Sequence, residues 1–129
     1  MKTKATILII DDDEFLLDMY SLKFRQSGWG VDIAMNPTEA IEKIKDGNLS
    51  LNVVLLDLVM PNMDGFDFLE VVKKENLLKD SQLVVLSNLG QQENIDKAMK
   101  LGASGYLVKA YLTPVEVVDK VSELLEKKK

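Results

Sequence analysis

The chain has 129 residues, a length typical of one domain, so we expect a single folded domain over residues 1–129. It contains no cysteine and no histidine, which excludes disulfides, thiolate metal sites, a serine–histidine–aspartate triad and phosphohistidine. The net charge is −5 and Arg25 is the only arginine, so we expect no direct binding to nucleic acid. Because no apolar run is long enough to cross a bilayer, we expect no membrane span and a soluble, cytoplasmic protein with a frayed end at Lys127–Lys129.

Five short apolar runs that are rich in β-branched residues predict five strands. Two of these runs, Ile7–Ile10 and Val53–Leu56, are apolar without alternation, as expected of strands that are covered on both faces. The predicted strands are Thr6–Ile10, Val31–Ala34, Asn52–Leu56, Leu83–Leu86 and Gly105–Val108.

Helical patterns alternate with these strands. Residues 36–39 combine an asparagine N-cap, proline at the first helical position and glutamate at the third, and residues 113–116 form a fuller capping box. The other predicted helices are Glu14–Gln26, Phe66–Glu75 and a shorter one around Ile95–Met99. Five β-α units in succession predict an α/β fold: an open, parallel, five-stranded sheet with helices on both faces.

In an open parallel sheet, ligands bind outside the carboxyl ends of the strands. The common five-stranded order 2-1-3-4-5, found in flavodoxin-like doubly wound folds, would place the ends of the first and third strands side by side. The chemically active residues at the predicted strand ends are Asp11, Asp12 and Asp13 after the first strand, Asp57 after the third, Ser87 after the fourth and Lys109 after the fifth.

Carboxylates gathered at the mouth of a dry sheet are unfavourable unless positive charge compensates them. Lys109 is one candidate for that charge, and a hard divalent cation is the other, with Mg²⁺ favoured over Ca²⁺ because few protein ligands are on offer. A carboxylate can act as a nucleophile toward phosphorus, so the pattern indicates phosphoryl transfer to Asp57. Each residue alone has a simpler explanation, such as helix capping or a solvated surface charge. The hypothesis depends on the fact that four strand ends all carry residues suited to the same chemistry.

At these residues the chain resembles the receiver domain of two-component response regulators, in the single-domain form of chemotaxis regulators. The resemblance covers nearly the whole length. It is strongest in the combination of a DD pair, a DxxMPxMDG stretch and a late lysine. The matching segments are Ile7–Asp12 (ILIIDD), Asp57–Gly65 (DLVMPNMDG), Val84–Ser87 (VVLS) and Gly102–Lys109 (GASGYLVK).

The resemblance implies that Asp57 accepts a phosphoryl group from a sensor histidine kinase or a phosphotransfer protein. Asp11, Asp12, Asp57 and the backbone carbonyl of Val59 would hold Mg²⁺, and Lys109 would pair with the phosphoryl oxygens. The domain would then catalyse its own phosphorylation and dephosphorylation, without being a conventional enzyme.

The resemblance also implies a switch. The hydroxyl of Ser87 would move toward the phosphoryl group, and Tyr106 would turn inward in response. The output surface for a downstream protein would be the face formed by the fourth helix, fifth strand and fifth helix, about residues 94–101, 105–108 and 113–125. The domain would be a monomer or a phosphorylation-dependent dimer.

Three departures from the family pattern concern the site. Ala110 stands where proline usually follows the lysine, so the Lys109–Ala110 peptide is either trans, with Lys109 placed differently, or strained. Asn88 is larger than the usual residue beside Ser87. Val59 and Leu89 are apolar at positions whose polar occupants orient water, which predicts slow autodephosphorylation.

Two other classes of function remain open from the residues. A phosphorylation-independent interaction module is favoured by Ala110 and Asn88 and disfavoured by the complete set of site residues. A Mg²⁺-dependent aspartyl phosphatase would need a second carboxylate at position 59, which is valine, and a flavin protein would need phosphate donors where three carboxylates stand. The last predicted helix ends close to the end of the chain, so we expect no effector domain after it.

Overall fold

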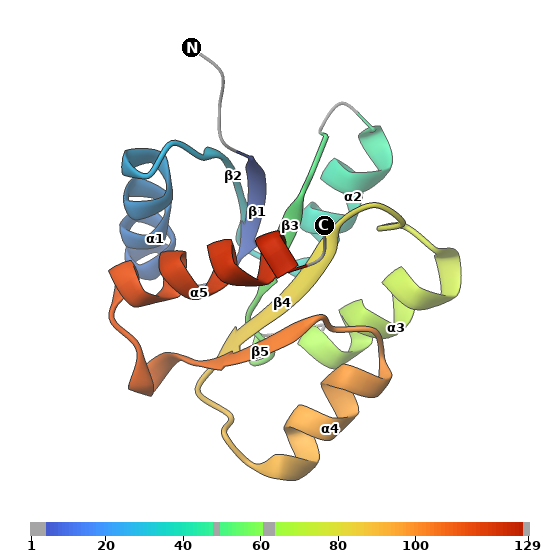
Figure 1. The fold of residues 1–129 in the computed structure, drawn as a ribbon. Helices are drawn as coiled ribbons and strands as arrows, with labels where there is room; N and C mark the ends of the chain where they lie inside the picture. The colour runs from blue at the N-terminus through green and yellow to red at the C-terminus, as the bar shows by residue number, and fades with distance from the viewer. Residues whose placement is uncertain (1–4, 48–49, 61–63, 128–129) are drawn as a thin grey trace.

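The structure is a computed structural model that describes residues 5–47, 50–60 and 64–127, without the side chain of Lys127. Residues 61–63 of the DxxMPxMDG stretch and the end of the expected frayed tail lie outside the described residues. One parallel sheet of five strands, in the order β2-β1-β3-β4-β5, forms the centre of the molecule (Figure 1). This confirms the α/β fold class and the strand order that the sequence predicts.

The strands begin and end within one residue of their predicted limits. β1 pairs in parallel with both β2 and β3, so that Ile7 lies opposite Val31 on one side and Val53 on the other. β4 lies between β3 and β5. The strands are β1 (Thr6–Ile10), β2 (Gly30–Ala34), β3 (Val53–Leu56), β4 (Gln82–Ser87) and β5 (Gly105–Val108).

The two helices for which caps are predicted, α2 and α5, begin at those caps. The side chain of Asn36 accepts a hydrogen bond from the Glu39 N–H at 2.8 Å, and Thr113 and Glu116 bond each other's backbone N–H groups. A single turn of 3₁₀ helix, Lys109–Tyr111, follows β5. The α-helices are α1 (Glu14–Gln26), α2 (Pro37–Asp46), α3 (Gly65–Glu75), α4 (Gln92–Lys100) and α5 (Pro114–Lys127).

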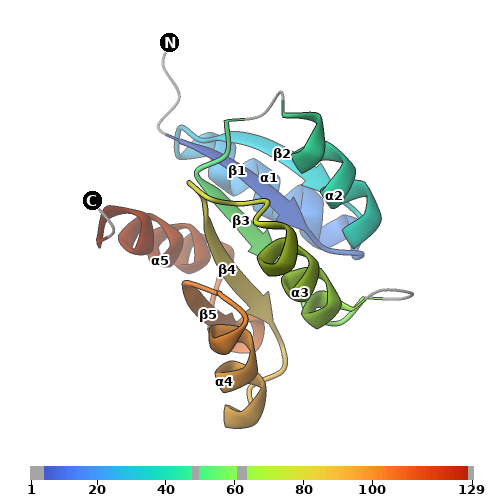
Figure 2. The same cartoon turned by 90° about the vertical axis from the view of Figure 1, so that its right-hand side faces the viewer.

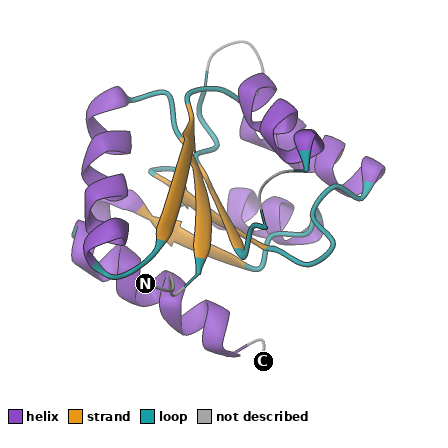
Figure 3. Ribbon diagram, turned by 90° about the horizontal axis from the view of Figure 1, so that it is seen from above, coloured by secondary structure: helices purple, strands orange, loops and turns teal. Residues whose placement is uncertain are grey.

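The sheet separates two apolar layers. Alternate residues of β1 point to opposite faces, so Ile7 and Ile9 join the cluster under α1 and α5, while Leu8 and Ile10 join the cluster under α2, α3 and α4 (Figures 2 and 3). β3 is buried along its whole length, which confirms the prediction of a strand that is covered on both faces. Within the described residues, no helix is both long and apolar enough to span a bilayer.

Candidate functional site

The carboxyl ends of β1, β3, β4 and β5 meet at a cavity of about 410 Å³. A larger cavity of about 580 Å³ lies near the amino ends of β3 and β4, by the C-terminal ends of α2 and α3. None of the predicted site residues lines it. The chemistry therefore assigns the site to the smaller cavity. Its lining consists of Asp11, Asp12, Asp13, Leu16, Asp57, Val59, Ser87, Asn88 and Lys109.

Three carboxylates meet at this cavity because β1 and β3 are neighbours. Asp11, Asp12 and Asp57 each offer one oxygen within 4.8 Å of the others. Asp11 and Asp57 are buried, whereas Asp12 is exposed at the mouth. Asp13 turns away from the cluster, because its side chain caps α1 by accepting a hydrogen bond from the Leu16 N–H at 3.1 Å.

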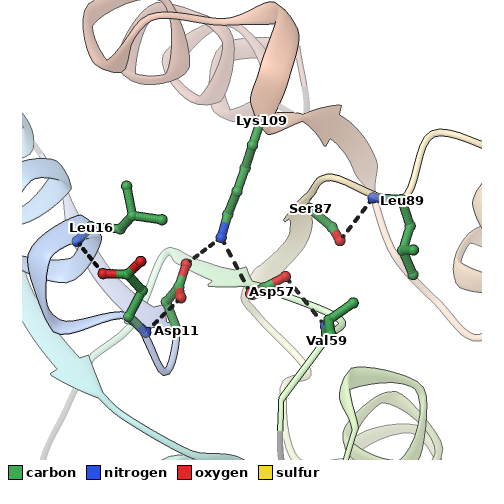
Figure 4. Close-up of polar contacts among 8 residues, drawn as sticks. Asp11, Leu16, Asp57, Val59, Ser87, Leu89 and Lys109 are labelled. Atoms are coloured by element: carbon green, nitrogen blue, oxygen red, sulfur yellow. Dashed lines mark hydrogen bonds and ion pairs between the residues drawn. The ribbon is translucent and has the colours of Figure 1, made fainter.

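Lys109 joins the two buried carboxylates (Figure 4). Its Nζ lies 2.7 Å from Asp11 Oδ2 and 3.2 Å from Asp57 Oδ2, and only 10% of its side chain is exposed. No cis peptide bond occurs in the described parts of the chain, so the Lys109–Ala110 peptide is trans. Of the two alternatives considered from the sequence, the structure shows the trans peptide, and Lys109 nevertheless contacts both carboxylates.

Negative charge exceeds positive charge at the centre of the site. Burial raises the pKa of the Asp57 carboxyl above its usual value of 3.8; Lys109 opposes this increase and Asp11 adds to it. Burial lowers the pKa of Lys109, but its hydrogen bond to Asp11 and the charge of Asp57 outweigh that effect and raise the pKa overall. Asp57 is thus a carboxylate with an incompletely neutralised charge, which favours an additional cation or proton.

Ser87, the last residue of β4, is fully buried beside the cavity. Its Oγ accepts a hydrogen bond from the Leu89 N–H at 3.3 Å, and so holds the first turn of the β4–α4 loop (Figure 4). The same loop residue accepts a hydrogen bond at its carbonyl from the Tyr106 hydroxyl. Ser87 and Tyr106, predicted as a pair from the resemblance, thus contact the two backbone groups of one residue, Leu89.

Val59 and Asn88 line the mouth of the cavity. Val59 is 59% exposed, and its N–H donates to Asp57 Oδ1 at 3.3 Å. Asn88 is also exposed. A metal-binding role for the Val59 carbonyl stays a prediction.

Sequence reasoning missed two residues of α1, one that lines the cavity and one that is buried near its charged groups. Leu16 lines the cavity from the first turn of α1, and Tyr20, one turn further, is 3% exposed with its hydroxyl in the field of Lys109 and Asp11. Burial raises the pKa of the Tyr20 hydroxyl, while Lys109 lowers it. The i, i+4 spacing of the two residues places them on one helical face, which is the signal that could have identified them.

The donor set fits a hard divalent cation. Carboxylate oxygens are the ligands that Mg²⁺ takes in proteins, and the cavity is wide enough for coordinated water as well. The excess of negative charge at Asp57 gives the same indication. Asp11, Asp12 and Asp57 are therefore the described residues that could hold a metal ion.

The doubly wound fold and this site define the class of protein: an α/β domain that carries an acidic cluster, a lysine paired with it and a serine hydroxyl at the carboxyl ends of its strands. The chain belongs to the response regulator receiver domain family, whose sequence profile matches residues 7–122. Chemotaxis protein CheY of Thermotoga maritima is 33% identical over 120 residues, with 91% of this chain and 97% of that protein covered. CheY of Treponema pallidum is 31% identical over 121 residues, with 93% and 82% covered.

Solved structures give the same result. The receiver domain of the Francisella response regulator 1452 superposes with a TM-score of 0.85 at 27% identity, with 98% of this chain and 100% of that chain covered. CheY4 of Vibrio cholerae has a TM-score of 0.84 at 26% identity, with 93% and 98% covered. The fold and the family are thus those of a CheY-like receiver domain of two-component systems.

Proposed function

We propose that the domain is a phosphoswitch that accepts a phosphoryl group on Asp57 from a sensor histidine kinase or a phosphotransfer protein. The observation that supports this most is the position of Lys109, within 3.2 Å of Asp57 and 2.7 Å of Asp11 at the mouth of a buried acidic cluster. Members of the receiver family are similar over most of this chain, and two of the relatives are chemotaxis proteins.

In the proposed reaction, a carboxylate oxygen of Asp57 attacks the phosphorus atom of a phosphoimidazole. The new O–P bond forms as the P–N bond breaks, and the electron pair of that bond stays on the imidazole nitrogen of the donor. Lys109, already beside Asp57, neutralises charge on the phosphoryl oxygens. Asp11, Asp12, Asp57 and the carbonyl of Val59 would hold Mg²⁺, which supplies further positive charge when bound.

The phosphoryl group adds charge and acceptor oxygens beside Ser87. We propose that its hydroxyl then exchanges the Leu89 N–H for a phosphoryl oxygen, which would alter the loop that Tyr106 also contacts. The change would reach the face formed by α4, β5 and α5, where a downstream protein would bind. Phosphorylation shifts this equilibrium only by its differential affinity for the two states.

Intact mass after incubation with a small acyl phosphate tests the proposal, with and without Mg²⁺. We expect one added phosphoryl group on the wild type with Mg²⁺, and none on Asp57→Asn. Glu75→Gln provides a matched control, because it makes the same type of change at an exposed carboxylate that pairs with Lys45. An adduct that persists in Asp57→Asn, or that forms equally without Mg²⁺, contradicts the proposal.

A phosphorylation-independent interaction module is the second candidate. Asn88, exposed at the mouth of the cavity, and Ala110, after Lys109, favour it. A protein partner that binds the wild type and Asp57→Asn with equal affinity, together with the absence of any phosphoryl adduct, would support this alternative.

A further inference from the structure

Helix α4 is the most weakly packed helix of the proposed output face. Among its nine residues only Ala98 is buried. Its N-cap residue, Gln91, makes no side-chain capping hydrogen bond. Apolar burial and capping are the usual sources of helix position and stability, so α4 depends more than its neighbours on its other contacts.

Two lysine contacts join α4 to α3, which lies beside it (Figure 2). From α4, the Nζ of Lys97 lies 4.4 Å from the centre of the Phe66 ring, within the range of a cation–π interaction. From α3, the Nζ of Lys73 donates to the carbonyl of Lys100 at 2.9 Å. The first contact is at the start of α3 and the second is near its C-terminal end.

The backbone that carries Phe66 is held close to the site. The preceding residue, Gly65, donates its N–H to the Leu58 carbonyl at 2.8 Å, and a Cβ on Gly65 would lie 2.5 Å from the Leu58 Cα. The start of α3 is therefore packed against the backbone immediately after Asp57. Phe66 is half-buried in the cluster that also contains Leu89 and Tyr106.

We propose that Phe66 and Lys97 form a latch that holds α4 against α3 in the unphosphorylated domain and thereby opposes activation. α4 begins only five residues after Ser87, so a movement of Ser87 and Leu89 toward a phosphoryl group pulls on its first turn. A cation–π contact is lost beyond about 6 Å from the ring centroid, so a displacement of α4 breaks it. A contact that exists in one state only shifts the equilibrium toward that state.

The inference rests on the proposed function and is tested with Mg²⁺ and beryllium fluoride, a mimic of the phosphoryl group, by isothermal titration calorimetry. Lys97→Met should bind the mimic about two- to fivefold more tightly than the wild type, the equivalent of one exposed cation–π contact. Lys97→Arg retains a cation over the ring and should behave as the wild type does. Lys100→Met removes the same charge one turn further along α4, at an exposed residue that contacts α3 through its backbone carbonyl, and should leave the affinity unchanged.

Hydrogen exchange of the α4 amides in the unphosphorylated domain tests the latch independently of phosphorylation. Exchange should be faster in Lys97→Met and in Phe66→Leu than in Lys100→Met, and the double variant should exchange no faster than either single one. Equal exchange in Lys97→Met and Lys100→Met overturns the latch. If exchange changes as expected but no protein binds the mimic, the contact that holds α4 against α3 stands, whereas the proposed phosphoswitch and the effect of the latch on activation both fail.

Discussion

Gly65 illustrates how a single residue can be required by a close approach rather than by a turn. Its φ lies outside the left-handed region, yet a Cβ there would lie 2.5 Å from the Leu58 Cα and 2.8 Å from the Asp57 carbonyl oxygen. Both neighbours are backbone atoms that cannot move without displacing Asp57. The start of α3 and the end of β3 therefore meet at a distance that only glycine allows.

Gly65→Ala should lower the free energy of unfolding by about 2 kcal/mol or more, because the added methyl group overpacks a rigid contact. Urea unfolding followed by the fluorescence of Trp29, the only tryptophan, measures the change. Gly90→Ala is the matched control, since a Cβ there meets only Val108 methyl groups at 3.8 Å. Equal effects of the two substitutions would contradict the close approach as the cause of the destabilisation.

Val59 lies at the mouth of the site, where it is 59% exposed and its side chain offers no polar group to a water molecule. We expect phosphorylated Asp57 to hydrolyse slowly for this reason. Val59→Asn should shorten the lifetime of the aspartyl phosphate, measured as the decay of the added mass with Mg²⁺ present. Val59→Leu should leave that lifetime unchanged. A wild-type lifetime of seconds that Val59→Asn does not alter would contradict the explanation.

At the scale of elements, α5 shows how local sequence positions a helix next to the site. Thr113 and Glu116 form reciprocal hydrogen bonds at its first turn, and Val117 and Val121, on its buried face, are fully covered by the cluster under α1. The helix therefore begins at Pro114, four residues after Ala110. Its start is anchored close to the turn that carries Lys109.

The capping box predicts a stability that depends on pH. The hydrogen bonds to Thr113 lower the pKa of the exposed Glu116 below its usual 4.5, so its stabilising effect is complete at neutral pH and is lost as the pH falls through the lowered pKa. Glu116→Gln should lower the melting temperature at pH 7, and this difference should shrink in acid. Thr113→Ala should cost about 1 kcal/mol at either pH. A Glu116→Gln difference that grows in acid would reverse the assigned sign.

At the scale of the whole molecule, the fold gathers buried like charges at the carboxyl ends of the strands, where they destabilise the folded state. Asp57 is 8% exposed and lies beside the carboxylate of Asp11, with a single lysine between them. Its raised pKa means that folding disfavours the ionised form relative to the unfolded chain. The site therefore opposes the stability that the two apolar layers provide.

Asp57→Asn should accordingly raise the melting temperature by a few degrees in the absence of divalent cations, because it removes a buried charge and keeps the Lys109–Asp11 pair. Mg²⁺ should stabilise the wild type, and should stabilise Asp57→Asn much less. Thermal unfolding with and without Mg²⁺ measures both effects. A wild type that is insensitive to Mg²⁺ would contradict a metal-binding role for the cluster.

The sequence alone determined the helices and strands, and it placed the candidate site at the carboxyl ends of the strands. Strand residues in short apolar runs, the capping patterns at 36–39 and 113–116, and the acidic residues after β1 and β3 are local signals, and the structure places each of them as predicted. The strand order was expected only because it is the common one among five-stranded doubly wound folds, since β-α alternation predicts a parallel sheet but does not fix the order of its strands.

Only the tertiary structure decided which side chains meet. Lys109 pairs with Asp11 across 98 residues of sequence, and Lys97 reaches Phe66 from a different helix. Such contacts depend on how the layers pack and on rotamers that are chosen in the folded state, and no local periodicity encodes them. The short distance that requires glycine at position 65 arises in the same way, because it depends on the packing of α3 against the end of β3.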